Sequence, residues 1–248
     1  SMKSVTSAFN SAGAITKDDA LSYVDSQVGP ILPDSQMTQV RQELQRHFKE
    51  LSQAQTESMK AYASSSEFRI ISSSEINAFV MTVTPQGSSR VKNLVFMTTA
   101  MLNHYLPRNL PESEVPARVS ALAGIMAHEL GHPTDTLDYS GIENHYGKVG
   151  NQAVEIRADS EAVDLLRSAG LPTESLYLAL ELLHMGPRHN PIEAGLETHP
   201  ETALRLSALR ARLTADRVKE VQSLARLPVI APSVARAILA EVKSHRVD

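Results

Sequence analysis

The segment "HELGH", residues 128–132, carries two histidines and a glutamate at a spacing that could bind a metal ion. If the segment is helical, His128 and His132 lie on one face about one turn apart, so both rings can reach the same ion. Glu129 then lies beside that ion and could accept a proton from a water molecule whose pKa the metal lowers to about 7. The pattern indicates hydrolytic metal chemistry, although two solvated histidines on an ordinary helix would have the same spacing.

A second segment, "EIRAD", offers a third ligand. Glu155 and Asp159 are four residues apart, so on a helix they share a face. Catalytic zinc takes three protein ligands and keeps a fourth position open, so Glu155 could bind the metal while Asp159 accepts the N–H of a ligand histidine. A solvated helix face would carry the same acids, since Glu161 and Asp164 follow nearby.

A third segment, "THPETAL", contains His199. Thr198 and Glu201 have the spacing of a capping box and Pro200 falls in the first turn, so the simplest interpretation is a well-formed helix start. At the positive end of that helix dipole, His199 could also donate a hydrogen bond to the oxyanion of a tetrahedral intermediate.

The rest of the chain must supply the elements that position these residues. Apolar residues at steps of three to four predict helices, and β-branched and aromatic residues between Ser, Pro and Gly breaks predict strands. Pro133 disfavours helix at His132, so the histidine-bearing helix should end at its second ligand. Two or three strands are expected within 64–98, with a hairpin turn near "PQGSS". A loop is expected over 133–150. Helices are expected in seven places: after Thr16, over 35–63, 113–132, 151–170 and 173–186, from residue 198 onward, and after "LPVIAP".

These elements predict an α+β protein, mostly helical, with a small antiparallel sheet packed against the helix that carries the histidines. We expect an N-terminal helical extension over 1–66, a catalytic domain over 67–226 and a C-terminal helical extension over 227–248. The two extensions could restrict access to the site or form a homo-oligomer.

Composition excludes several classes of partner and site. The net charge of −4 gives no general attraction for nucleic acid. The chain has no cysteine, so any metal must be held by His, Asp or Glu. No apolar run approaches the roughly 18 to 20 residues that a membrane-spanning helix needs.

In this order and spacing, the three segments resemble the zinc metallopeptidase family that includes the heat-shock membrane protease HtpX and the CAAX prenyl proteases, metallopeptidase family forty-eight, of the gluzincin type. That family pairs H-E-x-x-H with a downstream E-x-x-A-D and then an [ST]-H-P segment. It also has an Asn-Ala-Phe strand before the first motif, matched here by Asn77, Ala78 and Phe79. The resemblance covers about residues 67–212 and implies a gluzincin-like catalytic domain.

The resemblance implies that His128, His132 and Glu155 bind one zinc ion per chain. It assigns Glu129 as the general base, and Asp159 as the residue that orients a ligand.

For the remaining positions, the resemblance implies that His199 stabilises the transition state and that Arg205 pairs with an acid near the site. The strand with Asn77, Ala78 and Phe79 would be the sheet edge on which an extended substrate lies.

The function implied is a zinc-dependent endopeptidase that acts on unfolded or damaged polypeptides in the bacterial envelope or periplasm, in a soluble or lipid-anchored form, and that could be self-inhibited. The alternative is a zinc-binding, chaperone-like or structural protein without proteolytic activity. Glu129 argues against this alternative, because a purely structural zinc site has no use for a base beside the metal.

Overall fold

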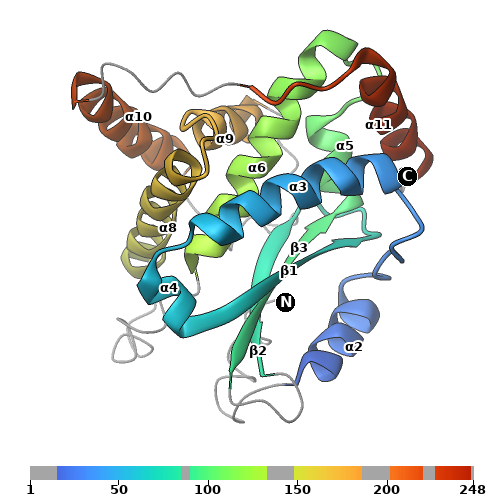
Figure 1. Ribbon diagram of the computed structural model, residues 1–248, viewed down its shortest axis with the longest axis horizontal. Helices are drawn as coiled ribbons and strands as arrows, with labels where there is room; N and C mark the ends of the chain where they lie inside the picture. Colours follow the sequence, from blue (N-terminus) through green and yellow to red (C-terminus); the bar gives the residue numbers. More distant parts are fainter. Residues whose placement is uncertain (1–15, 85–89, 133–147, 186–201, 220–226, 247–248) are drawn as a thin grey trace.

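The computed structural model describes residues 16–84, 90–132, 148–185, 202–219 and 227–246. Among these, three strands form one sheet in the order β1-β3-β2, as Figure 1 shows. The strands are β1 (Ala63–Ile71), β2 (Ala78–Val83) and β3 (Val91–Thr98).

The prediction of a small sheet is confirmed, but the prediction that it is antiparallel is wrong. β2 runs antiparallel to β3, whereas β1 runs parallel to it, so the sheet is mixed. The chain reverses direction between β1 and β2 and again between β2 and β3, so β1 and β3 point the same way. Residues Asn93 to Thr98 of β3 are all buried. A strand buried on both faces takes the central position, with β2 on one side and β1 on the other. The turn predicted near "PQGSS" falls at 85–89, outside the described residues.

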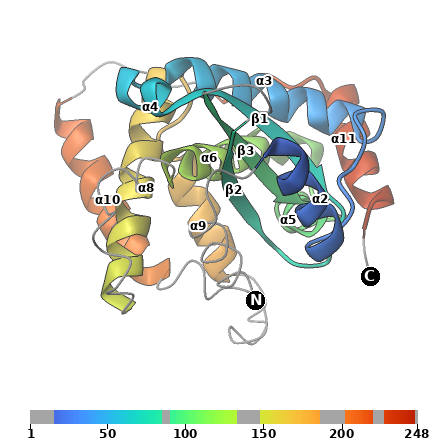
Figure 2. The same ribbon diagram turned by 90° about the horizontal axis from the view of Figure 1, so that it is seen from below.

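Helices cover both faces of the sheet (Figure 2). On one face, Val95 and Met97 of β3 join the main core, which also includes residues of α3 (Thr38–Ala54) and α6 (Val115–Gly131). On the other face, Leu94 and Phe96 form a smaller core with α2 (Lys17–Gln27). The alternating side chains of one strand therefore belong to two separate cores.

The first helix begins as predicted, because Thr16 accepts a hydrogen bond from the backbone N–H of Asp19 at 3.1 Å. The single helix predicted over 35–63 is instead two helices, α3 and α4 (Glu57–Tyr62). Gln55 is extended, and the Thr56 hydroxyl caps the new helix by accepting from the N–H of Met59. A threonine cap inside an otherwise helical pattern thus ends one helix and begins another.

The predicted boundary at residue 66 falls within β1, and α3 packs against α6 in the main core. The division into an N-terminal extension, a catalytic domain and a C-terminal extension stays a prediction.

The second half of the described chain is helical, as predicted. α6 ends at Gly131, with His132 as its C-cap residue, in agreement with the effect expected of Pro133. The other elements are α5 (Thr99–Tyr105), the short 3-10 helix η1 (Glu112–Glu114), α8 (Lys148–Ser168), α9 (Ser175–Met185), α10 (Thr202–Lys219) and α11 (Pro232–Ser244).

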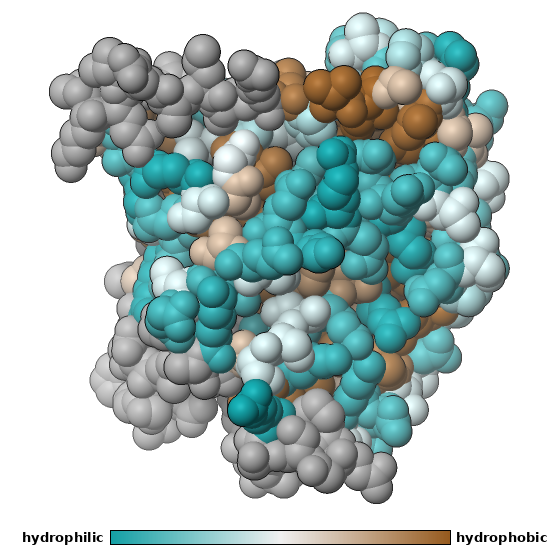
Figure 3. All heavy atoms as spheres, in the orientation of Figure 1, coloured by the Kyte–Doolittle hydropathy of each residue, from teal (hydrophilic) through white to brown (hydrophobic). Residues whose placement is uncertain are grey.

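The face of the molecule drawn in Figure 3 is mostly hydrophilic over α3, and a hydrophobic band runs along its upper edge over the segment leading into α11. Leu227 and Val229 of that segment are exposed. None of the helices in the described part of the chain is long and apolar enough to cross a bilayer.

Candidate metal centre

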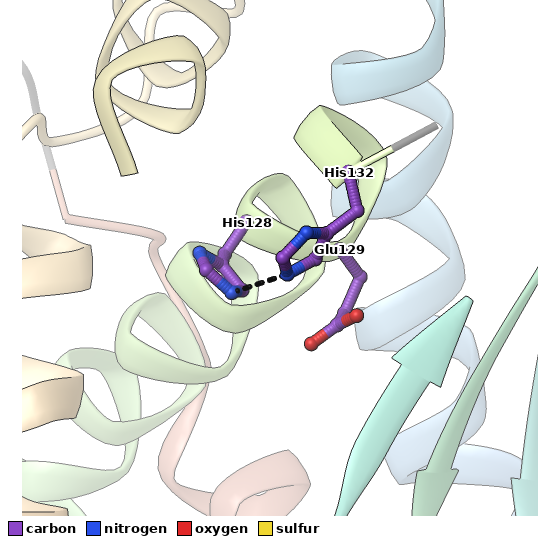
Figure 4. A group of neighbouring side chains, drawn as sticks. All are labelled: His128, Glu129 and His132. Atoms are coloured by element: carbon purple, nitrogen blue, oxygen red, sulfur yellow. Dashed lines mark hydrogen bonds between the residues drawn. The ribbon is translucent and has the colours of Figure 1, made fainter. Parts of the chain in front are cut away.

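The last turn of α6 brings two imidazole rings together. Nε2 of His128 and Nε2 of His132 lie 2.9 Å apart, and the rings are nearly perpendicular (Figure 4). The four-residue spacing produces this arrangement, since residues i and i+4 face the same side of a helix. His128 is buried, whereas His132, at the end of the helix, is partly exposed.

α8 crosses α6 and adds a carboxylate to the histidine pair. Oε2 of Glu155 lies 3.2 Å from Nε2 of His128, and its Oε1 lies 3.4 Å from Nε2 of His132. Tetrahedral zinc ligands at about 2.0 to 2.2 Å from the metal are themselves about 3.4 Å apart. The separations within this His-His-Glu set fit zinc, and the donor types are those that zinc prefers.

The second acid of α8 fixes the other side of the His128 ring. Nδ1 of His128 lies 2.8 Å from Oδ1 of Asp159, so the Nδ1 proton is donated there and Nε2 is left to face His132 and Glu155. Burial acts against the charged form of Asp159, but hydrogen bonds from Arg205 and His128 hold the pKa of its carboxyl at about 2.

α10 completes the cluster with Arg205. The guanidinium donates to both oxygens of Asp159, at 2.8 Å from Nε and 2.7 Å from Nη2. Its Nη1 lies 3.1 Å from Oε2 of Glu155. The arginine thus pairs with both acids of the "EIRAD" segment.

Glu129 lies on α6 between the two histidines in sequence, with its carboxylate directed toward the strands (Figure 4). Its carboxylate and the ring nitrogens of His128 and His132 offer ligand atoms within 4.8 Å of one another. Burial raises the pKa of Glu129 above its ordinary value. A carboxylate with a raised pKa is a stronger base than an ordinary one, as the transfer of a proton from water requires.

The electrostatics of this buried cluster favour a divalent cation. Glu129, Glu155 and Asp159 are each no more than 3% exposed, and in ionised form these three carboxylates face the single guanidinium of Arg205. With His128 in the neutral form that binds a metal, two negative charges are left over, which a divalent ion would balance. Burial and Arg205 act to lower the pKa of His128, but Glu155 and Asp159 raise it to about 10. A field that favours a proton here also attracts a metal cation.

Sequence reasoning overlooked two small residues that let α8 approach α6. A side chain on Gly131 would place its Cβ 2.9 Å from the carbonyl oxygen of Ala158, so only glycine fits without a shift. Ala158 is itself completely buried. Both motifs contain the small residue, since Gly131 directly precedes His132 in "HELGH" and Ala158 directly precedes Asp159 in "EIRAD".

The "NAF" segment leads into β2, an edge strand of the sheet. The backbone of Asn77 exchanges hydrogen bonds with Thr98, and Ala78 is buried in the main core. Phe79 stacks on Phe96 in the smaller core, away from α6. Any contribution of Phe79 to substrate binding would therefore come from its backbone.

His199 and most of the predicted loop over 133–150 lie outside the described residues. The structure thus brings together His128, His132, Glu129, Glu155, Asp159 and Arg205, and it leaves the position of His199 as a prediction.

Residues 38–146 match the model of peptidase family M48. This match supports membership of the M48 family. M48 proteins are metallopeptidases, which agrees with the His-Glu-His group on α6 that could hold a metal ion. No curated protein matches the sequence.

The M48 match includes "HELGH" and β2 but ends before Glu155, Asp159 and Arg205. These three residues join the site through the packing of α8 and α10. The later part of the M48 site therefore depends on tertiary contacts beyond the matched segment.

Proposed function

We propose that this protein is a zinc-dependent endopeptidase whose metal is held by His128, His132 and Glu155. The observation that carries the proposal is the convergence of two imidazole nitrogens from α6 and a carboxylate from α8 at separations of 2.9 to 3.4 Å. Membership of a metallopeptidase family supports hydrolysis of peptide bonds as the reaction.

A zinc ion bound there supplies a Lewis acid, which lowers the pKa of water to about 7 and polarises a carbonyl group. The residues of the chain supply the remaining chemistry. Glu129 accepts the proton of the attacking water on its buried carboxylate and passes it to the leaving amine. Asp159 keeps His128 in the tautomer that presents Nε2 to the metal. We assign His199 to stabilisation of the oxyanion.

The substrate we propose is an extended, unfolded polypeptide. β2 is an edge strand of the sheet that packs against α6, so a substrate strand could add to it through backbone hydrogen bonds. Recognition by the backbone of Asn77, Ala78 and Phe79 would depend little on the side chains of the substrate. A folded protein, whose backbone is already paired, would be a poor substrate.

The resemblance to proteases that degrade damaged proteins supports a role in protein quality control, which we place in the bacterial envelope. Self-association of the chain stays a prediction, and the exposed Leu227 and Val229 are where it would first be examined.

The decisive experiment measures degradation of unfolded casein by the wild type and by Glu129→Gln, each with its zinc content determined. We expect cleavage by the wild type, complete loss with a chelator, and a rate about 100- to 10,000-fold lower for the variant, because its amide cannot accept the proton. Glu161→Gln on α8, which removes a partly exposed acid paired with Arg157, is the matched control and should cleave like the wild type.

If the wild type and Glu129→Gln both retain zinc and neither cleaves casein, the proposed peptidase activity is wrong. The site would then serve the structural or chaperone-like alternative.

A further inference from the structure

Arg205 is the one residue of α10 seen in direct contact with the candidate metal centre among the described residues. Its guanidinium is 4% exposed and meets groups from two other helices. Nε and Nη2 form a fork on Asp159, Nη1 reaches Glu155, and Nη2 lies 3.3 Å from Nδ1 of His128. One side chain thus contacts a proposed metal ligand and the acid that orients another.

We propose that Arg205 is a positioning residue that holds Glu155 and, through Asp159, His128 in the geometry that binds zinc, and so sets the zinc affinity. The inference rests on the zinc site of the proposed function. A planar guanidinium is suited to this task, because its donors diverge at fixed angles and can bind two carboxylates at once. A lysine ammonium has no such fork.

The docking of α10 on α8 fixes where the guanidinium lies. Leu209 and Leu213 of α10 are buried in the main core. Further along the same two helices, Arg212 pairs with Asp164 at 2.6 Å, and Arg167 pairs with Asp216. These contacts are about two and three helical turns from Arg205, so they hold the helices together without touching the metal ligands.

The sign of the change in zinc affinity separates two roles for Arg205. As a mere charge, the guanidinium repels a divalent cation, so its removal would tighten zinc binding. As a positioning residue, it preorganises the ligands, and loss of such an outer partner typically weakens metal binding about 10- to 100-fold. A weaker affinity after neutralisation of Arg205 can therefore be assigned to lost positioning.

The test measures the zinc dissociation constant of the full chain by competition with a chromophoric chelator. The variants are Arg205→Gln, Arg205→Lys and the matched control Arg212→Gln, which breaks an ion pair between the same two helices. Thermal unfolding of each metal-free protein is recorded in parallel. We expect both Arg205 variants to bind zinc about 10- to 100-fold more weakly, and Arg212→Gln to stay within about twofold of the wild type.

Three results would overturn the inference: unchanged or tighter zinc binding by Arg205→Gln, wild-type affinity in Arg205→Lys, or an equal loss in Arg212→Gln. If Arg205→Gln does not fold, Arg205→Lys decides alone, because it keeps the buried charge and lacks only the fork. The test measures zinc affinity and not peptide cleavage. If the wild type binds zinc but cleaves no casein, the peptidase proposal is refuted and the inference about Arg205 is unaffected. A wild type that binds no zinc refutes both.

Discussion

His128 has its two ring nitrogens placed by different parts of the chain. Its Nε2 faces His132, one turn further along the same helix, and this contact follows from sequence spacing alone. Its Nδ1 meets Asp159, which is 31 residues away in sequence and belongs to α8. The ring is therefore oriented only when α8 packs closely on α6, which depends on Gly131.

We predict that Gly131→Ala weakens both the fold and the metal site. The new Cβ would lie 2.9 Å from the carbonyl oxygen of Ala158, so α8 must move by a few tenths of an ångström and carry Glu155 and Asp159 with it. Overpacking of this kind costs about 1 to 3 kcal/mol of unfolding free energy. Denaturant unfolding and zinc titration should show the loss of stability together with a several-fold weaker affinity for zinc.

Gly170→Ala is the control for this prediction. Gly170 has a φ of +71°, and a Cβ added there would meet no other atom within 4 Å. The substitution should therefore cost about 1 kcal/mol through backbone strain alone and leave zinc binding unchanged. If Gly131→Ala binds zinc as tightly as Gly170→Ala does, the close approach of the two helices is not required for the site.

At the scale of elements, a side chain of the C-terminal helix α11 caps the N-terminus of α3. The N-cap residue of α3, Met37, has a left-handed backbone and makes no side-chain capping bond. Glu241 of α11 takes that role, because its two carboxylate oxygens accept from the backbone N–H groups of Gln39 and Val40, each at 2.9 Å. A carboxylate at this end also complements the helix dipole. A residue near the end of the chain therefore caps a helix that lies near its beginning.

We predict that Glu241→Ala destabilises the protein by about 1 to 2 kcal/mol, since two backbone donors lose their partner along with the favourable dipole interaction. Glu241→Gln keeps an acceptor oxygen and should lose about half as much. Lys243→Ala, an exposed position on the same helix, is the control and should change the unfolding free energy by less than about 0.5 kcal/mol. Equal stability of all three variants in denaturant unfolding would show that the cap contributes nothing.

At the scale of the whole molecule, the metal centre joins three helices that the main core already holds together. α6, α8 and α10 each contribute buried apolar residues to that core, among them Met126, Leu166 and Leu209. The core does not depend on the metal, so the metal-free protein should fold. The surplus negative charge at the centre should nevertheless make that state less stable.

We predict that zinc raises the thermal unfolding midpoint. Free zinc at 100 times its dissociation constant should add about 2.7 kcal/mol of stability, because the ligands converge only in the folded state. Differential scanning calorimetry with zinc and with a chelator measures the shift. Glu155→Gln, which removes a proposed ligand, should reduce the response. An identical midpoint with and without zinc would contradict the assignment of this cluster as a metal site.

The local features of this protein can be predicted from its amino-acid sequence. The His-Glu-His spacing on one helix turn, the end of that helix before Pro133, the cap at Thr16 and the positions of most helices all follow from interactions within a few residues. Such interactions are set by backbone geometry, so patterns of residue types reveal them. The motif order also led to the family whose model matches residues 38–146.

Contacts between segments that are far apart in the sequence become visible only in the folded chain. β3, rather than β2, takes the centre of the sheet, so β1 pairs in parallel with a strand that follows β2 in the sequence. The fork of Arg205 on Asp159 and the cap that Glu241 places on α3 join residues 46 and about 200 positions apart. Contacts of this kind depend on how whole elements pack, and no local pattern of residues encodes that packing.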